Sequence, residues 1–149
     1  MRANRREAIM NHIDYMRRAL ALAEEAAAVG DVPVGCVIVQ DGKIIGEGRN
    51  RREEHSDATA HAELEAIRDA CRRLGSWRLH RCTLYVTMEP CPMCAGGIIN
   101  ARISEVHYGT WDEKAGACGS VLNLFEERFN HHPRLYHGPL EEECCAQLQ

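Results

Sequence analysis

Two short stretches of this chain indicate how it folds and what it binds: HAELEAIRDAC at residues 61–71 and MEPCPMC at residues 88–94. The second stretch places Cys91 and Cys94 three residues apart, with Pro92 where a proline suits the first turn of a helix. Residues at this spacing lie on nearly the same side of a helix. The two cysteines can therefore bind one metal ion together.

The first stretch contributes His61 and Glu63, which are two residues apart. This spacing turns the second residue about 200° around a helix axis, so in the middle of a helix the two side chains would point apart. They share a target only if it lies beyond the N-terminal tip, where side chains of the first turn converge. Thr59 is a suitable N-cap that would put both residues in that turn. We therefore expect two helix tips, whose N–H groups and dipoles favour anions, to face one point.

One imidazole and two thiolates suit zinc and leave its fourth tetrahedral position open, which is typical of a catalytic site. Two thiolates neutralise the ion, so a bound water needs a base nearby, and Glu63 is placed to be that base. The alternatives are a structural zinc half-site or a redox pair. A closed structural site would need another Cys or His pair, and His55, His80 and Cys82 do not form one. We predict one Zn²⁺ per chain, with the ligands His61, Cys91 and Cys94.

The size of the chain and its apolar pattern limit the class of protein to which it can belong. With 149 residues it fits a single domain at 1–149, in which residues 1–10 are expected to be a flexible N-terminal extension. No apolar run approaches the ~20 residues of a membrane span, and the basic N-terminus lacks the apolar segment of a secretory signal. We therefore expect a cytoplasmic protein with no membrane partner. Its cysteines outside the metal motif are expected to be buried thiols, because the cytosol keeps thiols reduced.

The charge of the chain gives little information about a nucleic-acid partner. The formal net charge is −4 and the sequence pI is about 6.1, so the strongly basic field of many RNA-binding proteins is missing. Arg49, Arg51 and Arg52 nevertheless cluster around Asn50. On charge alone, this cluster fits a basic rim for RNA and a solvated loop tip equally well.

The periodicity of apolar residues predicts alternating helices and strands. Asp41-Gly42 favours a two-residue hairpin turn, and a helix from near Asn11 should end at Gly30. Further helices are expected at 59–73, 92–101 and 139–148, and strands at 33–40, 43–50, 82–89 and 103–110. The polar loop at 51–58 and the Gly-, Asn- and His-rich segment at 111–138 carry no clear pattern. This order predicts an α/β protein with one sheet covered by helices on both faces, a three-layer α/β/α domain.

The motif His-x-Glu followed by Pro-Cys-x-x-Cys is the signature of zinc deaminases that act on nucleobases. Further blocks of the sequence resemble the bacterial tRNA-specific adenosine deaminases. They are DVPVGCVIV at 31–39, GEGRN at 46–50, DATAHAE at 57–63, TLYVTMEPCPMCAG at 83–96 and DEKAGACGS at 112–120. Two departures are Ala58, where the family usually has proline, and an end at Gln149 without the basic tail of some members, which would reduce one RNA contact surface.

The resemblance implies a cytidine deaminase-like fold with a mixed sheet of about five strands, in a homodimer. It implies hydrolytic conversion of adenosine to inosine at the wobble position of tRNA anticodons, in which zinc activates water and Glu63 moves protons. The anticodon stem-loop would be the macromolecular partner. By resemblance, two residues line the base pocket and two lie at the RNA-binding cleft: Val34 and Met88, and Asn50 and Asp112.

Three other functions remain open at this point. A free-base deaminase for guanine, or a cytosine or cytidine deaminase, would share the zinc motif and the fold. A noncatalytic, zinc-stabilised RNA-binding subunit belongs to a different class, and Glu63 argues against it because a structural zinc site needs no carboxylate beside its ligands. The sequence does not indicate which tRNAs are substrates.

Overall fold

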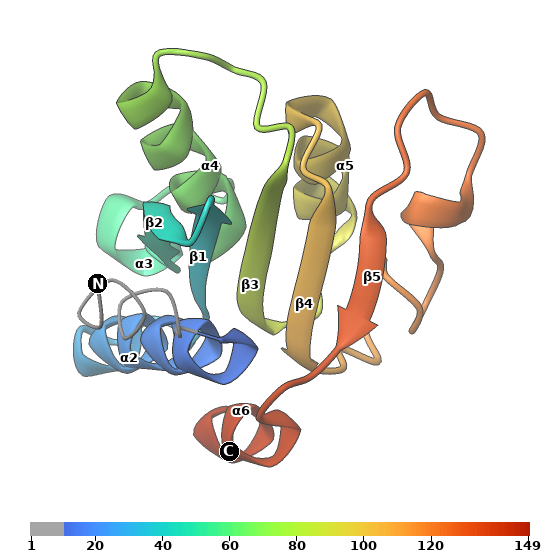
Figure 1. The fold of residues 1–149 in the computed structure, drawn as a ribbon. Helices are drawn as coiled ribbons and strands as arrows, with labels where there is room; N and C mark the ends of the chain where they lie inside the picture. The colour runs from blue at the N-terminus through green and yellow to red at the C-terminus, as the bar shows by residue number, and fades with distance from the viewer. Residues whose placement is uncertain (1–10) are drawn as a thin grey trace.

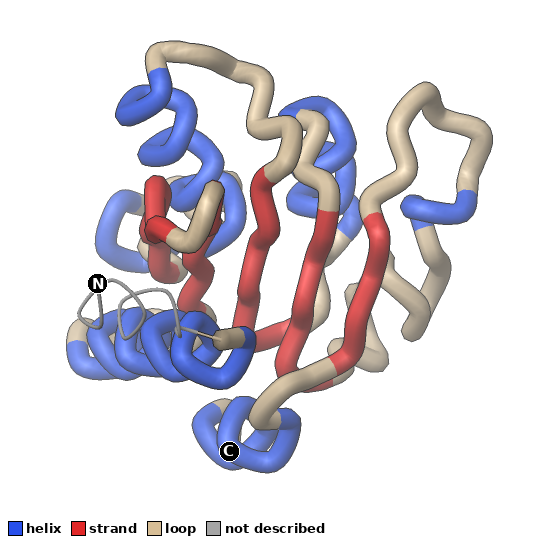
Figure 2. The backbone as a smooth tube through the Cα atoms, in the orientation of Figure 1, coloured by secondary structure: helices blue, strands red, loops and turns tan. Residues whose placement is uncertain are grey.

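The computed structural model describes residues 11–149 as a five-stranded sheet with helices on both faces (Figures 1 and 2). Residues 1–10, which were expected to be a flexible extension, lie outside the described residues. The strand order is β2-β1-β3-β4-β5, in which β1 is antiparallel to β2 and β3, and the other pairs are parallel. The bounds are Gly35–Gln40 for β1, Lys43–Arg49 for β2, Cys82–Met88 for β3, Glu105–Thr110 for β4 and Arg134–His137 for β5.

Two pairs of helices cover the two faces of this sheet (Figure 1). One face packs against α2 (His12–Ala28) and α6 (Glu141–Gln147), and the other against α4 (Ala62–Leu74) and α5 (Pro92–Ala101). The predicted three-layer α/β/α architecture with a mixed sheet is confirmed. Within the described part of the chain, no helix has the length and apolar character needed to cross a membrane.

Several predicted element boundaries are confirmed by their local chemistry. Asn11 caps α2 through a capping box, in which its side chain accepts a hydrogen bond from the backbone N–H of Asp14 and its own N–H donates to the Asp14 carboxylate. Asp41 and Gly42 form the hairpin turn with φ values of 50° and 76°, as a turn of this type requires. Gly75 ends α4 in the left-handed conformation, with φ of 66°.

The prediction that Thr59 caps the second long helix is wrong. The helix begins at Ala62 and its N-cap is His61. Thr59 belongs to the preceding turn, where its hydroxyl and backbone N–H donate to Asp57 Oδ1 at 2.7 and 2.8 Å. A nearby carboxylate captures the threonine, so its side chain is not used as a cap. His61 and Glu63 nevertheless both lie at the tip of α4, as the metal-site prediction requires.

Three elements lie where the sequence showed no clear pattern. The loop at 51–58 contains a four-residue helix, α3 (Arg52–His55), and the segment at 111–138 contains the edge strand β5 and a 3₁₀ turn, η1 (Leu124–Glu126). These elements are too short to show a hydrophobic period. Strand β5 is specified mainly by its parallel pairing with β4.

Strand β2 packs directly against α4 because two of its residues have no side chain. A Cβ atom at Gly48 would lie 2.3 Å from the carbonyl oxygen of Ala62, and one at Gly46 would lie 2.5 Å from that of Ala66. Beyond the strand, the N–H of Arg51 donates to Ala60 O at 2.9 Å, two residues before α4 begins, and the N–H of Asn50 donates to Val34 O at 3.0 Å, next to the start of β1. The end of β2 is therefore held beside the tip of α4.

Candidate active site

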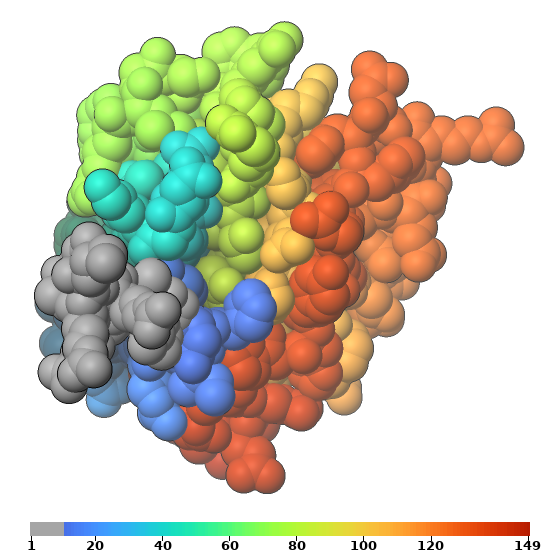
Figure 3. All heavy atoms as spheres, in the orientation of Figure 1, coloured from blue at the N-terminus to red at the C-terminus, as the bar shows by residue number. Residues whose placement is uncertain are grey.

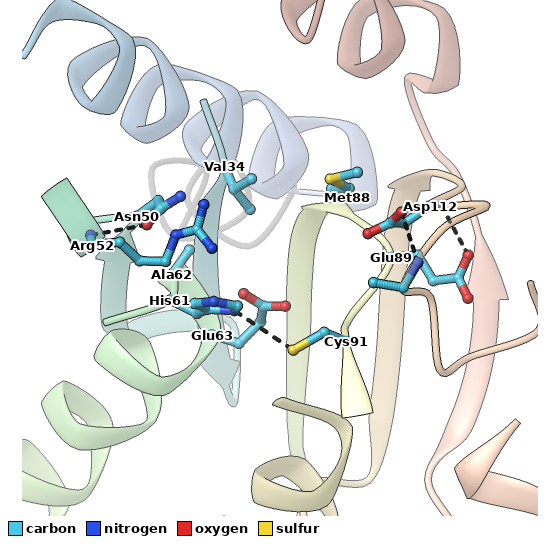
Figure 4. Close-up of a pocket in the computed structure, with 11 residues that line it drawn as sticks. Val34, Asn50, Arg52, His61, Ala62, Glu63, Met88, Glu89, Cys91 and Asp112 are labelled. Atoms are coloured by element: carbon cyan, nitrogen blue, oxygen red, sulfur yellow. Dashed lines mark hydrogen bonds between the residues drawn. The ribbon is translucent and has the colours of Figure 1, made fainter. Parts of the chain in front are cut away.

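A cluster of three potential metal ligands lies where the tips of α4 and α5 meet (Figure 4). His61 is the N-cap of α4, Cys91 is the N-cap of α5, and Cys94 follows in the first turn of α5. The distance from His61 Nδ1 is 3.6 Å to Cys91 Sγ and 3.4 Å to Cys94 Sγ. A tetrahedral ion with metal–nitrogen bonds of about 2.05 Å and metal–sulfur bonds of about 2.3 Å would separate N and S by about 3.6 Å. The spacing therefore fits a single ion.

The electrostatics of the two thiols also fit a cation. The hydrogen bond from Cys94, together with one from His61, lowers the pKa of Cys91 to about 4. The same Cys91 sulfur, together with burial, raises the pKa of Cys94 above its ordinary value. One thiolate thus forms readily, whereas a second beside it is strongly opposed. A bound cation would remove this opposition, because it compensates both negative charges.

Glu63 lies beside this cluster at the tip of α4 and is only 4% exposed (Figure 4). Burial disfavours its ionised form and raises the pKa of the carboxyl to about 7. A carboxyl group that titrates near neutrality can both accept and donate a proton at physiological pH. Glu63 therefore has the environment of a proton-transfer group.

A cavity of about 190 Å³ opens onto the cluster. Four of its lining residues lie at one end of the strands. At this end β2, β3 and β4 finish, and β1 begins, because β1 is antiparallel to β2 and β3. These residues are Val34, Asn50, Met88 and Asp112. His61, Glu63 and Cys91 also line the cavity, with Cys94 in contact behind them. The structure brings all eight predicted site residues together, and their roles in binding and catalysis remain predictions.

Two polar groups of the cavity have part of their hydrogen-bonding capacity committed to the backbone. Asn50 is 5% exposed, and its Oδ1 accepts from the N–H of Arg52 at 3.1 Å, which leaves its NH₂ group as a donor. Asp112 Oδ1 accepts from the N–H groups of Lys114 and Ala115, both at 3.1 Å. Its other oxygen is left as an acceptor.

The positive charge of the arginine cluster around Asn50, for which a basic rim and a solvated loop tip were both left open, is partly neutralised. Glu54 accepts from Arg49 at 2.9 Å and from Arg51 at 2.7 Å, and these bonds lower the pKa of its carboxyl. Arg52 lines the cavity and takes part in no ion pair among residues 11–149. The uncommitted positive charge at the cavity is therefore that of Arg52, whose guanidinium lies over the cavity in Figure 4.

Glu89, which was not among the predicted site residues, lines the cavity and is 3% exposed. The only signal was its position in MEPC, between a buried strand and the metal motif, where it was assigned to the end of the strand. Ala62 and Ala115 complete the cavity lining.

Comparison with known proteins identifies the family. Residues 10–142 match the model of the MafB19-like deaminases. Over 135 residues the chain is 47% identical to the tRNA-specific adenosine deaminase of Bacillus subtilis, in an alignment that covers 90% of this chain and 84% of the relative. The chain belongs to the tRNA-specific adenosine deaminase family. The predicted family and enzyme class are confirmed.

Solved structures agree with this membership. A structure from a study of A-to-I editing by tRNA:A34 deaminases at the wobble position superposes with a TM-score of 0.88 and 43% identity, covering 92% of this deaminase and all of that chain. The guanine deaminase of Bacillus subtilis has a TM-score of 0.67 and 39% identity, with 92% and 91% coverage. The fold is thus shared between a tRNA:A34 deaminase and a guanine deaminase, so the fold alone does not separate the two substrate classes.

Proposed function

We propose that this protein hydrolyses adenosine to inosine at the wobble position of tRNA anticodons. The observation that carries the proposal is the position of Glu63 beside a three-ligand cluster, at the base of a small cavity in a member of this family. The cavity volume of about 190 Å³ is below the ~300–1,000 Å³ usual for drug-sized ligands. It suits a single base that has been turned out of its stack.

We propose that the ion is Zn²⁺, one per chain, held by His61, Cys91 and Cys94. One nitrogen and two sulfur ligands suit zinc and leave one position free. The cluster is the only group of three potential ligands in the described part of the chain. When bound, zinc would supply an acidified water at the open position.

The protein's own residues would move the protons and hold the base. Glu63 would take one proton from the attacking water and deliver it to ring nitrogen N1. It would then take the proton of the hydroxyl added at C6 and deliver it to the amine, which leaves as ammonia. Val34 and Met88 would give the base apolar contacts. The Asn50 amide would donate to the sugar or base edge, and the free Asp112 oxygen would accept from a ribose hydroxyl.

The contact with the RNA backbone would come from Arg52. A phosphate beside the turned-out nucleotide would meet its guanidinium, because Arg49 and Arg51 are already paired with Glu54. A free base carries no phosphate and would gain nothing from this charge. The unpaired arginine thus favours an RNA substrate over free guanine.

We also propose that the protein acts in the cytoplasm as a homodimer. The segment between β4 and β5 exposes Val121, Leu122 and Phe129, at 58%, 43% and 48%. This orange segment projects from one side of the molecule in Figure 3. Exposed large apolar side chains in one segment are a feature that protein interfaces use. Light scattering on the purified protein would show a mass of two chains, and a mass of one chain would refute the dimer.

The test of the function compares an RNA hairpin with free bases. The purified protein is incubated with an anticodon stem-loop that carries adenosine at position 34, and in parallel with guanine and cytidine. We expect inosine in the hairpin and no turnover of the free compounds. Glu63→Gln serves as the control for contaminating deaminases. Turnover of guanine without inosine in the hairpin would assign the protein to the free-base deaminases, and no turnover of any of them would favour a binding subunit.

A further inference from the structure

The loop at 112–120 forms one wall of the cavity, and it is organised around a single carboxylate. Asp112 and Ala115 from this loop line the cavity, as does Glu89 from the end of β3. Glu89 is 3% exposed and forms no ion pair within residues 11–149. A buried carboxylate without a cation is costly unless several hydrogen bonds compensate it.

Four donors from the loop provide this compensation. Glu89 Oε1 accepts from the backbone N–H of Asp112 at 3.1 Å and from the hydroxyl of Ser120. Glu89 Oε2 accepts from the N–H groups of Cys118 and Ser120, both at 3.0 Å. The donors come from both ends of the loop, so the Glu89 side chain links the first residue of the loop to its last residues. Figure 4 shows the bond from Asp112 to Glu89 at the side of the cavity.

The loop also wraps closely around this carboxylate. A Cβ atom at Gly116 would lie 2.2 Å from Glu89 Oε2 and 2.5 Å from the carbonyl oxygen of Asp112. The next residue, Ala117, donates its N–H to Pro90 O at 2.8 Å. Glycine at 116 is therefore required by the approach of the carboxylate. Both oxygens of Glu89 are committed to the loop, which leaves them unsuited to a direct role on the substrate.

We propose that Glu89 is a positioning residue for deamination: by fixing the loop at 112–120, it holds the cavity wall that presses the base toward Glu63. This inference rests on the proposed function, because the effect is expected on the turnover of the bound base. Glu89 acts through Asp112 and Ala115, which reach the cavity. Its role differs from that of a group that moves protons or binds metal.

Replacing one carboxylate oxygen by an NH₂ group tests this role with little change of shape. In Glu89→Gln, two of the four loop donors lose their acceptor and the wall relaxes. We expect kcat on the anticodon hairpin to fall by about 10–100-fold, since a misplacement of about 1 Å costs about this much. KM should change by less than about threefold, because flanking nucleotides outside the cavity supply most of the binding. Metal content should stay at the parent value.

Three further variants sharpen the comparison. Glu113→Gln removes an equal charge from the same loop at an exposed side chain and should leave kcat and KM unchanged. In Gly116→Ala the added methyl group would displace the Glu89 carboxylate, so this variant should show the same loss of kcat. The inference therefore remains testable if Glu89→Gln folds poorly. Ser120→Ala removes only the hydroxyl donor and should cause a smaller loss.

Hydrogen exchange separates this inference from the proposed function. The amides of Asp112, Cys118 and Ser120 should exchange faster in Glu89→Gln than in Glu113→Gln, whatever base is the substrate. If the wild-type protein forms no inosine, the proposed function fails, and the kcat comparison is made on the base that it does deaminate. A Glu89→Gln protein with parental kcat, or with reduced stability but unchanged kcat and KM, would overturn the positioning role.

Discussion

The close contact between β2 and α4 makes a quantitative prediction about one added methyl group. In Gly48→Ala, the new Cβ would lie 2.3 Å from Ala62 O and 2.5 Å from Ala66 N, both backbone atoms of α4. Normal contact distances require the strand and the helix to separate by about 1 Å. Overpacking of this kind costs about 1–3 kcal/mol of folding free energy. We therefore expect a clear loss of stability in this variant.

The same substitution elsewhere in the chain provides a matched control. Gly96 lies inside α5, and a Cβ atom there would have no neighbour within 4 Å. Because alanine favours a helix more than glycine does, Gly96→Ala should stabilise the protein by about 0.5–1 kcal/mol. The midpoints of urea unfolding should therefore move in opposite directions in the two variants, with unchanged slopes.

The contact should also matter for activity. Residues at the tip of α4, His61 and Glu63, are positioned against the end of β2, where Asn50 lies. A shift of about 1 Å at this junction should lower kcat on the anticodon hairpin by up to about 100-fold at temperatures where the variant is fully folded. Equal unfolding midpoints for Gly48→Ala and Gly96→Ala would refute the close contact. A destabilised Gly48→Ala with parental kcat would show that the contact stabilises the fold without positioning the site.

Three other predictions follow from the site and the core. Cys94→Ser should lose bound zinc, measured by elemental analysis, and should unfold at a lower temperature because the ion no longer joins two helix tips. Asn50→Ala should lower hairpin deamination while the zinc content stays the same, and retention of full activity would remove Asn50 from the substrate contacts. Burial lowers the pKa of His107 in the fold, so protonation of the unfolded chain below about pH 6.5 should reduce stability as the pH falls. His107→Phe should flatten this dependence in urea titrations from pH 7 to 5, and an unchanged slope would refute it.

The cluster of potential metal ligands could be predicted because its geometry is local. A three-residue spacing on a helix and a two-residue spacing at a helix tip are properties of the backbone, so Cys91, Cys94, His61 and Glu63 could be brought to one point from sequence alone. The error at Thr59 did not affect this conclusion. The threonine bonds to Asp57 and not to the helix, but the helix still begins within three residues of it.

The elements that were missed depend on tertiary contacts. Strand β5 has four residues, of which three have exposed side chains and one is half-buried, and its pairing with β4 crosses a long connection. Helix α3 is a single turn whose first N–H groups are satisfied by the buried side chain of Asp31, from a distant part of the chain. No periodicity within 51–58 or 111–138 carries this information, because the stabilising partners lie elsewhere in the sequence.

The sequence shows which charged residues lie near one another along the chain, but it does not show which of them form ion pairs in the fold. The cluster at 49–52 shows three arginines, and nothing in the sequence distinguishes them. In the fold, Glu54 pairs with Arg49 and Arg51 and leaves Arg52 at the cavity, whereas Glu89 accepts hydrogen bonds from loop N–H groups and has no cationic partner within residues 11–149. The net charge of −4 therefore says little about RNA, because recognition depends on which charges remain unpaired at the site. One uncommitted guanidinium beside a base-sized cavity is a stronger argument for a nucleotide in a polymer than a basic pI would be.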